Sequence, residues 1–131
     1  MTLALLSLLA TALAAQESSD AYEGIARDDF AAWSYTTGQV VANGDSRTTS
    51  VMARYVNPLP VPNSSRTVAY SIHEITFHCS ARNSDWSAGA NYDADDAEIG
   101  SGTASTAEAW SDSTPGYVQL AETVCSMAGT T

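Results

Sequence analysis

The chain has 131 residues and a net charge of −10, with 15 acidic residues against 5 basic ones and no lysine. Such a surface repels nucleic acid, whose binding depends on Lys and Arg side chains that neutralise phosphates. It disfavours anionic membranes for the same reason. The length is that of about one small domain, so the composition excludes nucleic-acid binding and indicates a small acidic domain.

Residues 1–15 have the pattern of a secretory signal peptide. Their apolar run is shorter than the roughly 20 residues of a transmembrane helix, and it ends in the small residues of a cleavage site. We expect this leader to be removed, which leaves a mature chain from about Gln16. The product is then periplasmic or secreted and is not inserted in a membrane. The alternative is a buried N-terminal helix.

Cys79 and Cys125 are the two cysteines of the chain. An oxidising compartment permits a disulfide between them, and closing that loop would contribute about 4 kcal/mol in the chain-entropy model. The alternative is two free, buried thiols.

Residues 16–30 form a polar N-terminal segment, and residues 21–30 within it are predicted as a short helix with Asp20 as the N-cap. From residue 31 the pattern becomes rich in β-strands. We expect residues 31–131 to form a single domain.

The first strands of this domain surround a hairpin. Residues 33–36 alternate as a strand does, and Asn43-Gly44-Asp45 predicts a hairpin turn because Asn and Gly accept a positive φ. Residues 47–56 form the next strand. Residues 57–65 contain three prolines, which lack the N–H donor of a central strand, so we expect a wide loop there.

Residues 66–79 predict a long strand whose apolar side chains change face. The first half carries Val68, Tyr70 and Ile72 on one face, and the second half carries Ile75, Phe77 and Cys79 on the other. Either a β-bulge lies near His73-Glu74 or the strand serves two different cores. In the second case the face of Tyr70 and Ile72 needs another cover, and we predict a homodimer through this region.

Weaker strands are predicted over residues 86–92, 97–104 and 107–110. Thr114 then predicts a helix N-cap, with Pro115 at the first helical position. One face of this helix is apolar, through Tyr117, Leu120, Ala121, Val124 and Cys125.

Several pieces occur in an order and spacing shared with one family of bacterial secreted proteins. They are Trp33, a long strand ending in Glu74-Ile75-Thr76-Phe77-His78-Cys79, a Tyr92-Asp93 turn, Trp110 followed by Pro115-Gly116, and a helix ending in Val124-Cys125. Over residues 33–125 the chain thus resembles the surface-adhesin protein E family.

The resemblance implies an α+β fold. In it an antiparallel β-sheet of about five to six strands carries a C-terminal helix and is tied to it by one Cys79–Cys125 disulfide. The resemblance also implies a surface or periplasmic location and allows a homodimer. The namesake activity is adhesion to host matrix proteins, so the expected partner is an unknown protein or a matrix-type ligand.

The densest acidic cluster consists of Asp93, Asp95, Asp96 and Glu98. A calcium loop of the EF-hand type needs glycine at its sixth position, where this chain has Glu98. A solvated hairpin turn is the preferred interpretation, and a loose cation site is the alternative. His73 and His78 face opposite ways on a regular strand. We therefore expect neither a metal nor a cofactor.

Trp33, Trp86 and Trp110 either line a ligand groove or pack in the core. With Tyr70 and Ile72 they are the candidate ligand or interface residues. A G-x-S-x-G nucleophile elbow is absent from the sequence, and no catalytic residue is predicted.

The leading hypothesis is a non-enzymatic, secreted or periplasmic binding module whose ligand is unknown. One alternative is an envelope structural or stress protein without a discrete ligand. The other is a small periplasmic enzyme that uses a carboxylate and His73 in a pocket. A pocket joining those two groups would favour the enzyme, whereas an exposed aromatic patch would favour the binding module.

Overall fold

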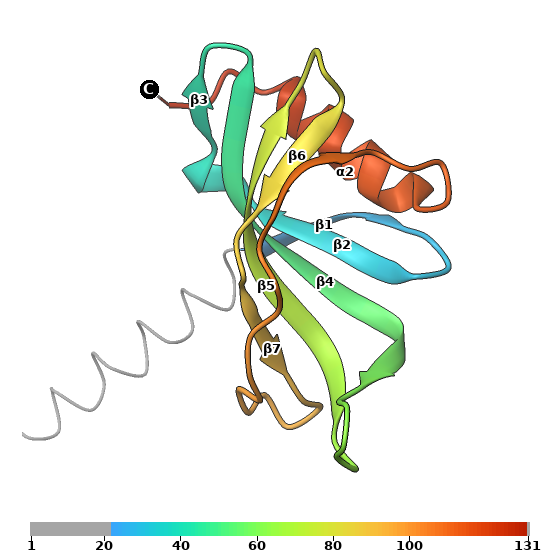
Figure 1. Ribbon diagram of the computed structural model, residues 1–131. Helices are drawn as coiled ribbons and strands as arrows, with labels where there is room; N and C mark the ends of the chain where they lie inside the picture. The colour runs from blue at the N-terminus through green and yellow to red at the C-terminus, as the bar shows by residue number, and fades with distance from the viewer. Residues whose placement is uncertain (1–21, 131) are drawn as a thin grey trace, which may run out of the picture.

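The computed structural model describes residues 22–130, which form eight strands, a short 3₁₀ helix and one α-helix (Figure 1). They are β1 (Tyr22–Arg27), β2 (Ala31–Thr36), η1 (Thr37–Gln39), β3 (Val41–Asn43), β4 (Ser46–Pro60), β5 (Thr67–His78), β6 (Asn83–Trp86), β7 (Ala90–Tyr92), β8 (Ser105–Ala109) and α2 (Pro115–Cys125). The predicted signal peptide and the polar residues 16–20 lie outside the described residues.

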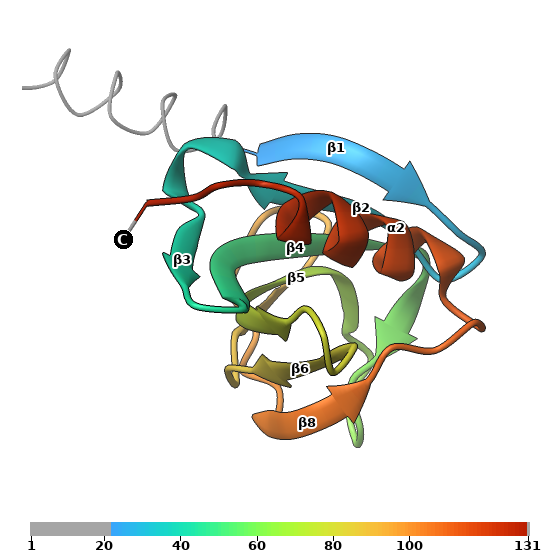
Figure 2. The ribbon, with the colours of Figure 1, turned by 90° about the horizontal axis from the view of Figure 1, so that it is seen from above.

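The strands form one antiparallel sheet in the main order β1-β2-β4-β5-β6-β8. The short strand β3 pairs with the start of β4, and β7 pairs with the middle of β5. The sheet curves strongly, and Figure 2 shows its strands as an arc with α2 inside it. The predicted α+β fold with an antiparallel sheet and a C-terminal helix is confirmed, with more strands than the five to six expected.

The hydrophobic core lies between the concave face of the sheet and α2. Every second residue of a strand points to this face, and the helix meets it with its predicted apolar stripe. The largest fully buried apolar side chains are Val51, Ile75 and Phe77 from the sheet and Leu120 and Val124 from the helix.

A disulfide joins the sheet to the helix. Cys79 directly follows β5, Cys125 is the last residue of α2, and their Cα atoms lie 5.8 Å apart. The predicted bridge is therefore confirmed. It closes a separation of 46 residues, which corresponds to about 4 kcal/mol of stabilisation in the chain-entropy model.

The prediction of a short helix over residues 21–30 is wrong. Residues Tyr22–Arg27 form β1 instead and pair with β2, with an irregularity between Gly24 and Ala26. An isolated helix of this length is marginal in water, whereas the ladder to β2 pairs the backbone of the segment, and Ile25 packs against the core. Tertiary pairing thus overrides the local preference.

The hairpin turn is confirmed, because Asn43 pairs with Ser46 and Gly44 has a φ of 58°. The wide loop over residues 57–65 is only partly confirmed. β4 bulges after Arg54 and then continues, so that Leu59 and Pro60 pair with the start of β5. Pairing with β2 has ended by then at Tyr55, and a proline without an N–H is tolerated where a strand has a partner on one side.

The change of apolar face along β5 comes from two cores and not from a bulge. Pairing with β4 is regular from Arg54–Tyr70 to Ser46–His78. Ile75 and Phe77 face the main core. Val68 and Tyr70, on the opposite face, are 6% and 8% exposed.

Candidate ligand-binding pocket

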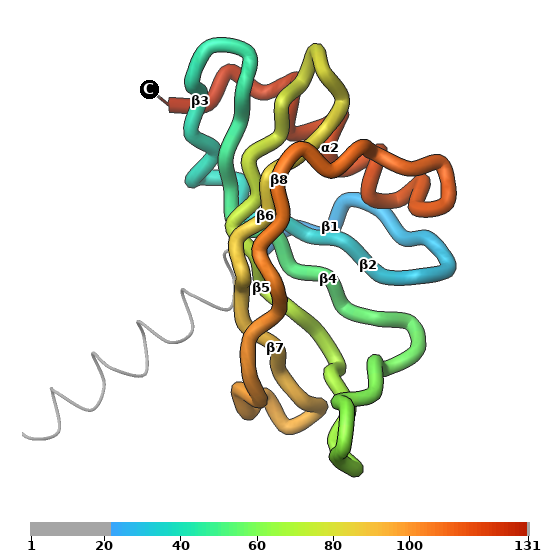
Figure 3. The backbone as a smooth tube through the Cα atoms, viewed as in Figure 1, coloured from blue at the N-terminus to red at the C-terminus, as the bar shows by residue number. Residues whose placement is uncertain are grey.

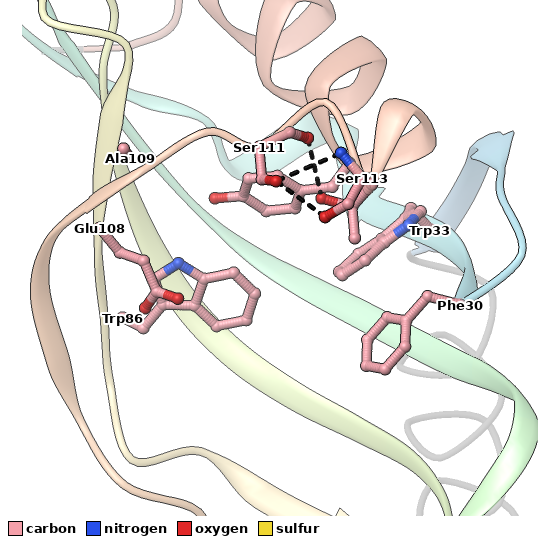
Figure 4. Close-up of a pocket in the computed structure, with 9 residues that line it drawn as sticks. Phe30, Trp33, Trp86, Glu108, Ala109, Ser111 and Ser113 are labelled. Carbon is pink, nitrogen blue, oxygen red and sulfur yellow. Dashed lines mark hydrogen bonds between the residues drawn. The ribbon is translucent and has the colours of Figure 1, made fainter.

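An open pocket of about 260 Å³ lies beside the N-terminal end of α2, where the loop before the helix passes β2 and the β6–β8 edge of the sheet. In Figure 4 Trp33 and Phe30 stand on one side, Trp86 and Glu108 on the other, and Ser111 and Ser113 above them. The lining consists of Phe30, Trp33, Trp86, Glu108, Ala109, Ser111, Ser113, Thr114 and Tyr117.

Four aromatic rings form the wall of this pocket and pack against one another. The Trp33 ring lies 5.0 Å from Tyr117 at 64° and 6.5 Å from Trp86 at 80°. Trp86 and Tyr117 stack at 5.3 Å, and Phe30 lies 6.3 Å from Trp33. Edge-to-face and stacked pairs at these distances are favourable, so the rings hold one another in place.

Asp28, in the turn between β1 and β2, fixes the Phe30–Trp33 side of the pocket. Its Oδ1 accepts hydrogen bonds from the backbone N–H groups of Phe30 and Ala31, both at 2.9 Å. Its Oδ2 accepts the indole N–H of Trp33 at 3.0 Å. One carboxylate therefore sets both the course of the turn and the orientation of a pocket ring.

The same carboxylate caps α2. Gly116 and Tyr117 donate their backbone N–H groups to Oδ2 of Asp28 at 2.9 and 3.3 Å. Thr114 occupies the predicted N-cap position, but its hydroxyl donates to the carbonyl of Ser111 and makes no cap bond. A Cβ on Gly116 would lie 2.8 Å from Oδ2, so glycine is what lets the turn approach the helix.

Burial acts to raise the pKa of Asp28, but the hydrogen bonds from Ala31, Trp33, Phe30 and Tyr117 outweigh it and hold the pKa below the usual 3.8. The side chain is therefore ionised at neutral pH. A negative charge at this position also stabilises the helix N-terminus through the helix dipole.

Ser84 of β6 anchors the opposite wall. It is fully buried, and its Oγ accepts the Tyr117 hydroxyl and the indole N–H of Trp110, each at 2.8 Å. Burial raises the pKa of Tyr117 well above its usual value, and the hydrogen bond to Ser84 offsets part of that rise. Tyr117 is therefore a neutral hydrogen-bond donor at physiological pH.

Pairing with the buried Ser84 brings Glu108 to the pocket, and a bulge in β8 brings Ser105 to the same face. β8 runs along β6 before the chain turns into α2 (Figure 3). Ser84 pairs with Glu108 but Trp86 pairs with Ser105, so β8 has one extra residue between these pairs. Residues three apart on a regular strand face opposite ways. The extra residue puts Ser105 and Glu108 on the same face, where Ser105 donates to Glu108 Oε2 at 2.8 Å.

Asp85 supports the bulge from the outer face of the sheet. Ala107 has a φ of 50°, a strained value for a residue with a Cβ, and donates its N–H to Asp85 Oδ1 at 2.8 Å. Asp85 Oδ2 lies 2.8 Å from Nε2 of His78, whose Nδ1 is hydrogen-bonded to Ser46. The Ala107 N–H, and then His78, lower the pKa of Asp85.

The structure brings two of the three predicted tryptophans together. Trp33 and Trp86 line the pocket, whereas Trp110 packs against Phe77 and lies under the guanidinium of Arg82. The alternative interpretation, in which the tryptophans pack in the core, also applies to Trp33, because this side chain lines the pocket but is only 3% exposed.

Tyr70 and Ile72 lie on the convex face, away from the pocket. The Tyr70 ring stacks on Tyr92 at 4.9 Å, lies 4.4 Å below Arg54 and donates its hydroxyl to Asp96 at 2.9 Å. Burial, followed by the contact with Asp96, raises the pKa of Tyr70 to about 12. The chain thus covers Tyr70 with its own residues and leaves Ile72 partly exposed. The homodimer through this region stays a prediction.

The acidic cluster forms a turn in which the carboxylates point to different partners. Asp93 Oδ1 accepts the N–H groups of Asp95 and Ala97, and its other oxygen lies 3.8 Å from Arg66. Asp96 receives the Tyr70 hydroxyl. Over residues 22–130, no three His, Cys, Asp or Glu side chains are placed to hold a metal ion together.

The two histidines point to opposite faces of β5, as predicted. His73 shares the inner face with Val51, its partner in β4. Its Nδ1 is hydrogen-bonded to the Ser87 carbonyl at 2.9 Å, and its ring contacts Trp86. It is not a lining residue of the pocket.

Sequence reasoning missed Asp28, Phe30, Glu108 and Tyr117 as site residues. Tyr117 was expected only on the buried stripe of the helix. Asp28 and Phe30 fell in the segment predicted as a helix. Glu108 reaches the pocket through its pairing with Ser84, and no local pattern indicates that register. The available signal was Gly116 at the second helical position. Glycine is a poor helix former, so its presence there indicates that another segment lies too close for a Cβ atom.

No family model and no curated protein sequence matches this chain. The resemblance to the surface-adhesin protein E family therefore stays a prediction. Among residues 22–130 there is no helix both long and apolar enough to span a membrane.

Proposed function

We propose that this chain is an exported, non-enzymatic binding module that takes a small ligand, or a side chain of a partner protein, into the aromatic pocket. The observation that carries the proposal is the pocket, an aromatic wall held from behind by Asp28 and Ser84. A surface that is ordered before the ligand arrives loses little conformational entropy on binding. Apolar pockets with a few placed polar groups are the usual form of ligand sites.

The placement of His73 favours binding over the enzymatic alternative. The enzyme hypothesis requires a carboxylate and His73 in one pocket, and Glu108 lines the pocket while His73 does not. Phe30, 42% exposed at the pocket, supplies the exposed aromatic surface expected of a binding module.

Two features support export. The leader over residues 1–15 has the signal-peptide pattern, and the Cys79–Cys125 disulfide is of a kind that persists in oxidising compartments. The order of motifs from Trp33 to Cys125 supports a surface-adhesin E-like domain. Intact-mass measurement on the exported protein should find the leader removed, and retention of Met1 would contradict export by this route.

Ligand-observed NMR with a library of small amines, sugars and aromatic acids tests the binding function. The control is Ser113→Trp, which places a large side chain at the lining of the pocket and leaves Asp28 and Ser84 unchanged. We expect at least one compound to bind the wild type, to lose its signal with the variant and to remain chemically unchanged. Conversion of the compound would indicate an enzyme, and equal binding to both proteins, or to neither, would contradict a ligand site here.

A further inference from the structure

We propose that the pocket binds a small organic cation with a quaternary ammonium group, of the choline type. This inference rests on the proposed binding function and specifies its ligand. Pocket size gives the first argument. At about 260 Å³, the pocket is smaller than the roughly 300 Å³ at which sites for drug-sized ligands begin, so a compact ligand fits best.

Charge selects a cation. Glu108 is the one acidic side chain among the nine lining residues, and neither Arg nor His lines the pocket. The Ser105 hydroxyl donates to Glu108 Oε2 at 2.8 Å, which holds the carboxylate at the lining of the pocket. The chain as a whole carries a net charge of −10, so its field attracts cations and repels anions.

The aromatic wall selects a methylated cation. Rings attract cations that lie against their faces, and tryptophan does so most strongly. The rings that a ligand meets are those of Phe30, which is 42% exposed, and Trp86, which is partly exposed, and the buried Trp33 packs against both of them. An ammonium with N–H groups would leave donors unsatisfied against such a wall, whereas a trimethylammonium group has no donors to satisfy.

The polar side of the pocket offers little to a sugar. The hydroxyls of Ser111 and Ser113 are hydrogen-bonded to each other at 2.7 Å, and the hydroxyl of Thr114 donates to the Ser111 carbonyl. A sugar presents many hydroxyl groups, each of which needs a partner when it is buried. The site is therefore better matched to an apolar cation than to a neutral polyol.

Titration calorimetry of the mature domain with choline and with 3,3-dimethyl-1-butanol tests the inference. The two probes have nearly the same shape, and only choline is charged. We expect choline to bind about tenfold more tightly, because a desolvated cation over aromatic faces is stabilised by roughly one factor of ten. Ethanolamine, with its three N–H donors, should bind more weakly than choline, and glucose should not bind.

Two variants locate the effect. Glu108→Gln should weaken choline binding about threefold and leave the neutral probe unchanged, and Glu74→Gln, an exposed acid outside the pocket, is its matched control. Phe30→Leu keeps apolar volume but removes a ring, so it should reduce the preference for choline over the neutral probe.

Equal affinity for choline and its neutral isostere, or a choline affinity that Glu108→Gln does not change, would overturn the inference. So would tighter binding of ethanolamine or glucose. If a neutral library compound binds at the pocket and choline does not, the binding function stands and this inference falls. If no probe and no library compound binds, both fall.

Discussion

Replacing Asp28 with alanine should destabilise the domain strongly. Among the described polar side chains that are not fully buried, we expect Asp28 to be the one whose loss lowers the unfolding free energy most. The carboxylate accepts hydrogen bonds from five N–H groups, three in and after its own turn and two at the start of α2. Loss of the helix cap costs about 1 kcal/mol. The indole N–H of Trp33, on a residue that is 3% exposed, would be left without a partner, at about 1–3 kcal/mol. We therefore expect a loss of about 2–4 kcal/mol.

Urea unfolding followed by tryptophan fluorescence measures this loss. With a slope of about 1.5 kcal/mol per molar urea, a loss of 3 kcal/mol lowers the midpoint by about 2 M. Asp29→Ala is the matched control, because Asp29 is the adjacent acid and is exposed. A loss below about 1 kcal/mol for Asp28→Ala, or an equal loss for both variants, would refute the role assigned to Asp28.

The pH dependence gives a second test of the same side chain. The pKa of Asp28 in the folded state lies below its ordinary value of 3.8, so the unfolded state binds the proton more readily. The stabilisation is therefore complete above pH 3.8 and is lost as the pH falls through the folded-state pKa. The difference between wild type and Asp28→Ala should be constant near neutral pH and should narrow below pH 3.8. A difference that widens on acidification would contradict the direction of the shift.

Three further changes test the packing around the pocket. Gly116→Ala should lower the unfolding free energy by about 1–3 kcal/mol despite the higher helix propensity of alanine, because its Cβ would lie 2.8 Å from Asp28 Oδ2. The control is Gly24→Ala, since a Cβ at Gly24 would have no atom within 4 Å. Equal effects of the two substitutions would be evidence against a close approach at Gly116. Ala107→Gly should raise the unfolding free energy by about 1 kcal/mol, because Ala107 has a φ of 50°. Ala109→Gly in the same strand should lower the unfolding free energy by about 0.5–1 kcal/mol. If both substitutions changed the unfolding free energy in the same direction, strain at the bulge would be ruled out. Reducing the disulfide should lower the unfolding free energy by about 2–4 kcal/mol in urea titrations with and without reductant, and an unchanged midpoint would mean that the bridge does not constrain the unfolded chain.

Most features that sequence reasoning predicted correctly depend on residues close together in the chain, and the disulfide is the exception. The hairpin at Asn43-Gly44-Asp45 follows from the φ that its turn needs. The helix after Pro115 follows from its proline and its apolar spacing, and the change of face between Ile72 and Ile75 can be counted along one strand. The disulfide could be predicted because two cysteines allow a single pairing.

The amino-acid sequence by itself determined the hairpin turn, the C-terminal helix, the acidic surface and the pair of cysteines, since each follows from local conformational preference or from composition. Tertiary structure alone decided the pocket. Asp28 caps α2 through the N–H of Gly116, 88 residues later in the chain, and no local preference couples positions so far apart. Residues 22–27 are a strand because β2 offers them a ladder. Glu108 lies at the pocket because it pairs with the buried Ser84, and one extra residue in β8 then places Ser105 opposite Trp86. No single segment encodes this register, because it depends on how two strands align.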